Sequence, residues 1–254
     1  MQAPRSKLFL AGDCLSQLDE ALQSGPDALS IDLEDGVAGA LKSQARTEVA
    51  RLLQARRLPC QVWVRINGLD SGQTVADLLA LAGAQVDVIN LPKVQAPSDL
   101  VFVERLLAHI EQDSGRTTPI RIVPTIETAQ GLRRAAAIAK ASPRVLALQL
   151  GAGDLLASTG IARAGPGLNL IRAALSLAAA EAGLAALDST PHSLSDPSAF
   201  EADAQQALAL GFQGKSCMAV QQVAVANRVF GASPRTAPVH RSDGFTEQAR
   251  PGRP

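Results

Sequence analysis

The chain has 254 residues, no formal net charge and 46% hydrophobic residues, which is enough apolar material for a sizeable core. No stretch concentrates Lys and Arg, which argues against a dedicated nucleic-acid binder, and three cysteines without CxxC spacing argue against a disulfide framework or a structural zinc site. The opening MQAPRSKLFLAG lacks the apolar core of a signal peptide, and no apolar run is long enough for a membrane-spanning helix. We therefore expect a cytoplasmic protein with neither a nucleic-acid nor a membrane partner.

Short apolar runs alternate with longer amphipathic ones along the chain. The predicted strands cover residues 7–12, 28–34, 61–67, 87–94, 121–128, 145–151, 185–189 and 211–217. Helical periodicity, with apolar residues three and four positions apart, appears between them at residues 41–56, 98–112, 128–141, 169–183 and 199–211. Strands that are nearly continuous apolar runs are typical of parallel strands covered on both faces.

Eight strand–helix units in succession predict an α/β fold, a (β/α)8 TIM barrel that forms a single domain over residues 1–232. The alternative is an open doubly wound sheet. It is disfavoured because no GxGxxG follows the first strand. Polar residues also end almost every strand, whereas in an open sheet they would cluster at one switch point. Residues 233–254 lose apolar periodicity and are rich in Pro, Arg and Gly. We expect this tail to be flexible or to act as an oligomer arm.

Charged and polar residues gather where the predicted strands end. Barrel enzymes place their active sites at the C-terminal ends of the strands, so this density predicts a site there. Any one of these residues could equally belong to a loop that meets water. The set comprises Asp32, Glu34, Asp35, Arg65, Asn67, Lys93, Glu127, Asp154, Asp188 and Lys215.

The segment SIDLEDG, residues 30–36, places three carboxylates within four positions directly behind an apolar strand. Such a cluster is tolerated either in a solvated turn or around a cation or an arginine. Arg65, in VWVRING, stands at a strand position that is normally apolar. A guanidinium there needs a carboxylate partner or an anionic substrate, and an ion pair with the 30–36 segment is the alternative to a substrate role.

Three further rim residues have both a functional and an ordinary interpretation. Glu127 follows a strand and opens a helix, for which Thr128 could be the N-cap. Asp154 follows two glycines that would let backbone N–H groups approach an anion, or it caps a helix. Lys93 we expect to be a solvated loop lysine. Because no histidine falls at a predicted strand end, carboxylates with water, and hence Mg²⁺ or Mn²⁺ in place of zinc, are the favoured metal chemistry.

At this point the motifs resemble the HpcH/HpaI aldolase/citrate lyase family, in particular its branch of citrate lyase β-subunit-like and malyl- or citramalyl-CoA lyase-like proteins. The resemblance runs in order from residue 5 to about residue 230. It is carried by RSKLFLAG, SIDLEDGVAGALKSQAR, VWVRIN, INLPKV, TIETAQGL, LGAGDL and GFQGKSCMAVQQ. No one segment is decisive, but their order and separations are specific. The family is a (β/α)8 barrel, commonly a homotrimer or hexamer, which agrees with the fold predicted from periodicity.

The resemblance implies a Mg²⁺-dependent (or Mn²⁺-dependent) carbon–carbon lyase or aldolase. Such an enzyme cleaves or forms a 3-hydroxyacyl-CoA or a related 2-oxo acid adduct through an enolate. Glu127 and Asp154 would ligate the metal ion. Arg65 would bind the carbonyl or enolate oxygen of the 2-oxo acid. Fixed positive charge at that oxygen is what enolate chemistry requires.

The remaining roles implied by the resemblance concern positioning and substrate binding. Glu34 and Asp35 would orient the arginine or metal-bound waters. Arg5 would lie near the site and contribute to substrate binding. The carboxylate of the 2-oxo acid would be held by backbone amides at Ala152, Gly153 and Asp154.

The sequence departs from the family at two places. LFLAGD at residues 8–13 stands where the family usually has Val-Pro-Gly, and Met218-Ala219-Val220 replaces the common Ile-His-Pro. The family's general acid/base comes from a C-terminal region that we cannot match to this shorter tail. These departures leave the metal and oxo-acid residues intact and concern the thioester side. The alternatives are therefore a pyruvate-type aldolase or a thioesterase-like hydrolase at the same site, or a non-catalytic subunit of a lyase complex.

Overall fold

Eight parallel strands pair in chain order and close into a barrel, as the sequence predicts. The computed structural model describes residues 1–190 and 196–231, so the predicted tail lies outside the described residues. The strands are β1 (Ser6–Ala11), β2 (Ala28–Asp32), β3 (Gln61–Arg65), β4 (Val88–Leu91), β5 (Arg121–Ile126), β6 (Ala147–Leu150), β7 (Ala185–Asp188) and β8 (Gly214–Cys217).

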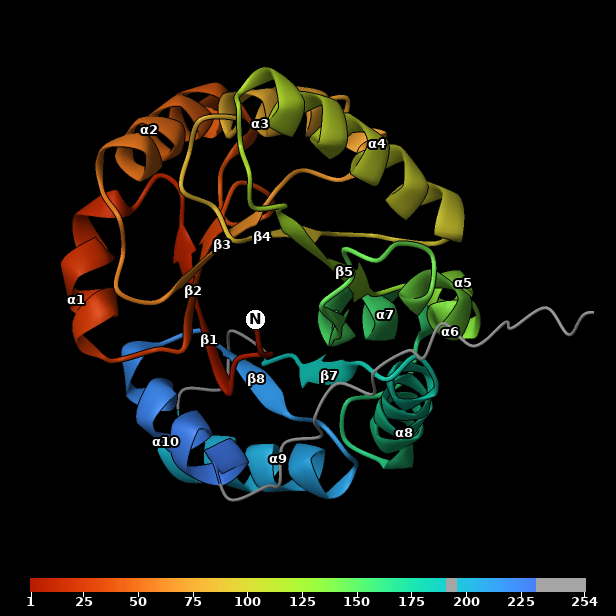
Figure 1. Ribbon diagram of the computed structural model, residues 1–254. Helices are drawn as coiled ribbons and strands as arrows, with labels where there is room; N and C mark the ends of the chain where they lie inside the picture. The colour runs from red at the N-terminus through yellow and green to blue at the C-terminus, as the bar shows by residue number, and fades with distance from the viewer. Residues whose placement is uncertain (191–195, 232–254) are drawn as a thin grey trace, which may run out of the picture.

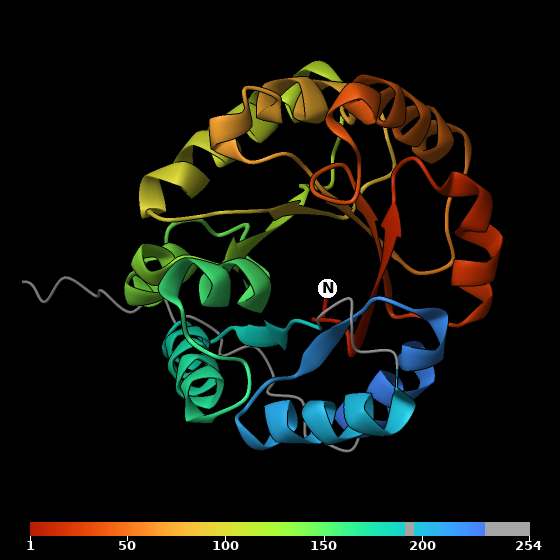
Figure 2. The same ribbon diagram turned by 180° about the vertical axis from the view of Figure 1, so that it is seen from behind.

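Helices surround the barrel and cover its outer face (Figures 1 and 2). The short helix that follows β6 lies nearer the barrel axis than the helix after it. None of the described helices is long and apolar enough to cross a membrane. The α-helices are α1 (Leu18–Gln23), α2 (Lys42–Ala55), α3 (Thr74–Ala80), α4 (Pro97–Asp113), α5 (Ala129–Arg133), α6 (Ala135–Ala139), α7 (Ala152–Thr159), α8 (Pro166–Glu181), α9 (Pro197–Ala209) and α10 (Val220–Gly231).

All strands but β1 are shorter than predicted, and for three of them the structure shows a local reason. β4 ends at Leu91 because Pro92 lacks an N–H and Lys93 adopts a positive φ of 55°. β5 ends before Thr128, whose side chain caps α5. β8 begins only at Gly214, since Gly211, with φ 90°, belongs to the turn that follows α9.

Side chains alternate along each strand between the barrel interior and the helix layer. The lower interior contains a small hydrophobic cluster, whereas the larger apolar core lies between the strands and the helices. Alternation also decides which polar residues reach the upper, C-terminal end of the interior, where the active sites of such barrels lie. The interior cluster contains Ala28, Trp63, Val88, Val123, Leu146, Ala147 and Leu187.

Asp188 and Lys215, which the sequence places at the catalytic rim, instead face the helix layer, so that prediction is wrong. Strand alternation explains the outcome, because their neighbours Leu187 and Ser216 take the inward positions. Both side chains are fully buried and paired with each other. Arg172 of α8 lies 2.8 Å from the Asp188 carboxylate, and Asp203 of α9 bonds both cations. This network joins the barrel to two helices.

We predict that Asp188→Ala lowers the free energy of unfolding by about 3–5 kcal/mol, because Arg172 and Lys215 would both remain buried without this partner. Urea denaturation followed by circular dichroism measures the change. Lys140→Ala is the control, since its ion pair with Glu181 is exposed and should contribute less than about 1 kcal/mol. Equal effects of the two substitutions would contradict a role for the buried network.

Candidate active site

A buried ion pair between Arg65 and Asp32 organises the rim. The two residues are register partners on β3 and β2, and both side chains point inward. Arg65 donates from Nε and Nη2 to the two carboxylate oxygens of Asp32, at 2.6 and 2.5 Å. Burial opposes ionisation of Asp32, but hydrogen bonds from Arg65 and from the N–H groups of Glu34 and Gly36 outweigh it and lower its pKa. The bidentate pair fixes the plane of the guanidinium.

Glu34 and Asp35 hold different places around that arginine. Glu34 is 5% exposed and lies 3.1 Å from Nη1 of Arg65 and 3.1 Å from Nζ of Lys93. Burial raises the pKa of Glu34 even though both cations favour its charged form. The side chain of Asp35 is mostly exposed and lies 4.0 Å from Arg65. The sequence prediction that these acids orient the arginine therefore agrees with the geometry chiefly for Glu34, and Asp32 makes the tighter contact.

Lys93 is part of the site, although the sequence predicts a solvated loop lysine. Among the residues that the structure describes, it is the one non-glycine residue with positive φ. Such a backbone costs on the order of 1–3 kcal/mol and persists only where the surroundings impose it. Here it lets the Lys93 N–H donate to Oε1 of Glu127 at 2.5 Å while Nζ bonds Glu34. One residue thus orients two carboxylates.

Glu127 leaves the end of β5 and is only 5% exposed. Thr128 caps α5 by accepting the N–H of Gly131 at 3.0 Å, so the cap and the acidic residue have separate roles. Burial and the nearby carboxylates of Glu34 and Asp154 raise the pKa of Glu127 to about 8, against the opposing effects of the Lys93 N–H and Arg65. Such a carboxyl readily exchanges a proton for a cation.

Asp154 lies in the first turn of α7, whose N-cap is Gly151, so Asp154 is not itself the helix cap. A Cβ atom on Gly151 would collide with the Glu127 carboxylate, which explains the glycine. The amide of Ala152 already donates to Oγ of Ser189 at 3.1 Å. The N–H groups of Gly153 and Asp154 are first-turn donors without carbonyl partners in the helix and can bind an anion.

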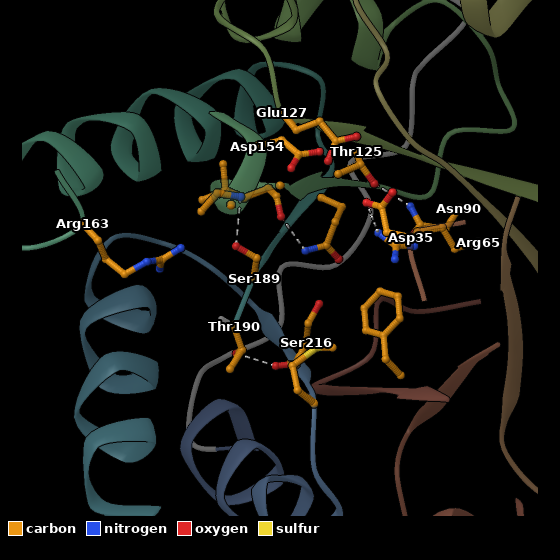
Figure 3. Close-up of a pocket in the computed structure, with 17 residues that line it drawn as sticks. Asp35, Arg65, Asn90, Thr125, Glu127, Asp154, Arg163, Ser189, Thr190 and Ser216 are labelled. Carbon is orange, nitrogen blue, oxygen red and sulfur yellow. Dashed lines mark hydrogen bonds and ion pairs between the residues drawn. The ribbon is translucent and has the colours of Figure 1, made fainter. Parts of the chain in front are cut away.

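These residues surround a cavity of about 320 Å³ at the upper end of the barrel. In Figure 3, Glu127 and Asp154 lie next to each other, and Arg163, from the α7–α8 connection, lies on the side of the cavity opposite Arg65 and Asn90. The predicted residues Asp35, Arg65, Glu127, Ala152, Gly153 and Asp154 all line this cavity. The structure thus brings most of the predicted site together.

Glu34 does not line the cavity but contacts Arg65, whereas Arg5 lies apart from the site, at the other end of the barrel. It precedes β1, and its guanidinium bonds the carboxylate of Asp27, just before β2, at 2.7 and 2.8 Å. A residue before a parallel strand lies at the N-terminal end of the barrel, away from the catalytic rim. The expectation that Arg5 binds substrate is therefore not met in this chain.

Sequence reasoning missed the neutral polar residues of the cavity. They stand at inward positions of strands that are otherwise apolar, and a polar residue at such a position is the signal that identifies them. Arg163 was missed because it lies in a loop beyond α7, where an arginine is unremarkable. The missed residues that line the cavity floor are Asn90, Thr125, Gln149 and Ser216.

The carboxylates of Glu127 and Asp154 are suited to a hard divalent cation. Mg²⁺ binds through one or two protein carboxylates and fills its other positions with water and substrate oxygens. No group of three or more His, Cys, Asp or Glu side chains that could hold a metal occurs in residues 1–190 and 196–231. A two-carboxylate set beside an open cavity fits Mg²⁺ and does not provide the closed site of a structural zinc ion.

Comparison with known proteins decides the family. The family model described as HpcH/HpaI aldolase/citrate lyase matches residues 5–219. The chain belongs to this family. The resemblance carried by the sequence motifs is thereby confirmed, as is the TIM-barrel fold.

Relatives within the family are lyases by name. The chain is 34% identical to the L-malyl-CoA/beta-methylmalyl-CoA lyase of Cereibacter sphaeroides over 90% of this chain and 79% of that protein. It is 32% identical to the citrate lyase subunit beta of Haemophilus influenzae, over 91% and 80%. The citrate lyase beta subunit of M. tuberculosis, solved with oxaloacetate and magnesium, superposes with a TM-score of 0.74 at 28% identity, over 90% of this chain and 97% of that one. The prediction of a carbon–carbon lyase agrees with these relatives.

We predict that Gly151→Ala weakens Mg²⁺ binding by about 10- to 100-fold, because the new methyl group would displace the Glu127 carboxylate. Isothermal titration calorimetry with Mg²⁺ measures the loss. Gly39→Ala is the matched control, since a Cβ there meets no described atom within 4 Å. If both variants bind Mg²⁺ like the wild type, Glu127 does not hold the ion.

We also predict that the Mg²⁺ affinity rises with pH and levels off above about 8. Glu127 in the metal-free protein is protonated below its pKa of about 8, and the cation must displace that proton. The affinity should therefore fall by up to about tenfold for each pH unit below this value. Calorimetry at pH 7 in two buffers of different ionisation enthalpy should show release of about one proton per ion bound. An affinity independent of pH between 6 and 8 would contradict the assignment.

Proposed function

We propose that this protein is a Mg²⁺-dependent carbon–carbon lyase that cleaves a 3-hydroxyacyl-CoA, or a related adduct of a 2-oxo acid, and catalyses the reverse condensation. The observation that carries this proposal is a guanidinium fixed by Asp32 on the same cavity as the carboxylate pair Glu127 and Asp154. Relatives named as malyl-CoA lyase and citrate lyase beta subunit support the reaction class.

Glu127 and Asp154 would hold the magnesium ion. When bound, the ion supplies Lewis-acid charge at the carbonyl oxygen of the 2-oxo acid. Nε and Nη2 of Arg65 donate hydrogen bonds to Asp32, and its third nitrogen, Nη1, lies next to Glu34. Because the guanidinium is preorganised and largely buried, its charge acts without reorganisation where negative charge develops on the enolate oxygen.

Two proton transfers accompany cleavage of the carbon–carbon bond. The substrate hydroxyl loses its proton as the carbonyl of the 2-oxo acid forms, and the enolate carbon of the other product gains one. The first-turn N–H groups of Gly153 and Asp154 are available for the carboxylate of the acid, while Ser189 occupies the N–H of Ala152.

The segment that replaces the family's Ile-His-Pro is ordered and lies at the cavity. Met218 lines it, and the N–H groups of Met218 and Ala219 donate to Oε1 of Gln222, at 2.7 and 3.3 Å. The thioester would therefore meet an apolar side chain here in place of an imidazole. A CoA thioester remains the proposed substrate because of the malyl-CoA lyase relatives.

A homotrimer or hexamer and a cytoplasmic location stay predictions. Two leucines of α8, Leu170 and Leu177, are 70% and 72% exposed and one heptad apart, so they lie on one face of the helix. Exposed apolar side chains of this kind support a protein contact at α8.

We predict Mg²⁺-dependent turnover of malyl-CoA or citramalyl-CoA, measured by coupling release of the 2-oxo acid to a dehydrogenase. Glu127→Ala should reduce kcat/KM by at least about a hundredfold, because the metal site supplies several kcal/mol of transition-state stabilisation. EDTA should do the same. Glu181→Ala, which removes an exposed acid of α8, is the control.

The other outcomes separate the alternatives. Binding of pyruvate or oxaloacetate with Mg²⁺, but no thioester turnover, would favour an aldolase that acts on free acids. Release of free CoA without carbon–carbon cleavage would favour a hydrolase. Neither binding nor turnover would favour the non-catalytic subunit and reject the proposal.

A further inference from the structure

Gln149 lines the cavity and carries a buried acceptor that has no partner among the described residues. It faces inward from β6 and is 3% exposed. Its Nε2 lies 3.0–3.1 Å from the carbonyl oxygens of Leu150, Leu187 and Asp188, which fixes the orientation of the amide, because a flipped amide would set oxygen against oxygen. Its Oε1 is buried without a hydrogen-bond partner in the described part of the chain. A buried acceptor in this state requires a donor from a ligand or a water molecule.

Thr125, the register partner of Gln149 on β5, presents the complementary donor. Its Oγ1 accepts a hydrogen bond from Nδ2 of Asn90 at 2.9 Å. Asn90 cannot reverse this role, because its Oδ1 accepts from Nζ of Lys7 at 3.0 Å and its Nδ2 also donates to the carbonyl of Val123. The proton of the Thr125 hydroxyl is therefore left for another acceptor.

The pair lies one layer below the residues proposed to bind metal. Thr125 precedes Glu127 by two positions, and Gln149 precedes Gly151 by two. Two strand residues span roughly 6.6 Å, about the reach of a three-carbon acid whose carboxyl end lies at the rim. All four of these residues line the same cavity.

We infer that Thr125 and Gln149 form a subsite for a hydroxyl group on C3 of the 2-oxo acid. This inference rests on the proposed function and adds a preference for hydroxylated 2-oxo acids over pyruvate, the acid released from citramalyl-CoA. A hydroxyl accepts from Thr125 and donates to Gln149, so it satisfies both groups at once. A methyl group satisfies neither, and a carboxylate would bring a negative oxygen against Oε1 of Gln149. Sites built to bond a hydroxyl discriminate strongly against analogues that lack it.

The test compares binding of 3-hydroxypyruvate and pyruvate to the full-length protein with saturating Mg²⁺, by isothermal titration calorimetry. The wild type should bind 3-hydroxypyruvate at least about tenfold more tightly, which is the expected effect of leaving a buried acceptor unsatisfied. Gln149→Met keeps the side-chain volume and removes the acceptor, so it should abolish the preference.

Further variants guard against a misfolded Gln149→Met protein. Thr125→Val should also reduce the preference, whereas Thr125→Ser should retain it. Thr190→Val is the cavity control, since the Thr190 hydroxyl donates to the carbonyl of Ser216; it should change both affinities by the same factor.

Equal affinity of the wild type for the two acids would overturn this inference alone, because a water molecule would then satisfy Gln149. A preference that survives in both Gln149→Met and Thr125→Val would overturn it as well. If neither acid binds in the presence of Mg²⁺, this inference fails, and the proposed function fails as well only if thioester turnover is also absent.

Discussion

The site depends on the ion pair between Arg65 and Asp32. Burying two charges is costly, and the pair is tolerated because Asp32 also accepts two backbone N–H groups and sits opposite Arg65 in the strand register. The guanidinium additionally lies over the ring of Phe9, 5.2 Å from its centroid. The fixed Arg65 forms an ion pair with Glu34. Lys93 then contacts both acids, with its ammonium group at Glu34 and its backbone N–H at Glu127. The cluster of like charges at residues 30–36 is thus stable because it surrounds a cation.

Close backbone approach is the second constraint on this rim. Gly151 permits Glu127 to pack against the start of α7, and Gly36 leaves room for the Asp32 carboxylate. Lys93 accepts a left-handed backbone to direct its N–H at Glu127. These features cost conformational freedom or strain, and they position two carboxylates that repel each other. The backbone at the rim therefore adopts conformations that are unfavourable locally because they place the charged side chains correctly.

The barrel and the charged part of the site could be predicted from the sequence, because eight apolar runs and charges at their ends are conspicuous against an apolar background. Arg65, Glu127 and Asp154 were identified in this way. Asp188 and Lys215 belong to strands but alternate toward the helix layer, and Arg5 precedes its strand, so a charged residue near a strand does not by itself identify the rim. The role of Lys93 could not be predicted, since it arises from a backbone conformation that only the folded surroundings impose.

The contrast between the two layers of the barrel interior bears on function. The lower layer is mainly hydrophobic, although the buried ammonium group of Lys7 lies over the ring of Trp63 within it. The layer above it contains Asn90, Thr125 and Gln149, which are buried and whose polar groups are held by one another, by Lys7 and by backbone carbonyls. Burying polar groups stabilises a core poorly even when all are bonded. One acceptor in this layer, Oε1 of Gln149, is unpartnered within the described residues, and Gln149 lines the cavity shared with Arg65 and Glu127. Buried polar side chains in this layer are therefore explained by a ligand that enters the cavity and donates a hydrogen bond to Oε1 of Gln149.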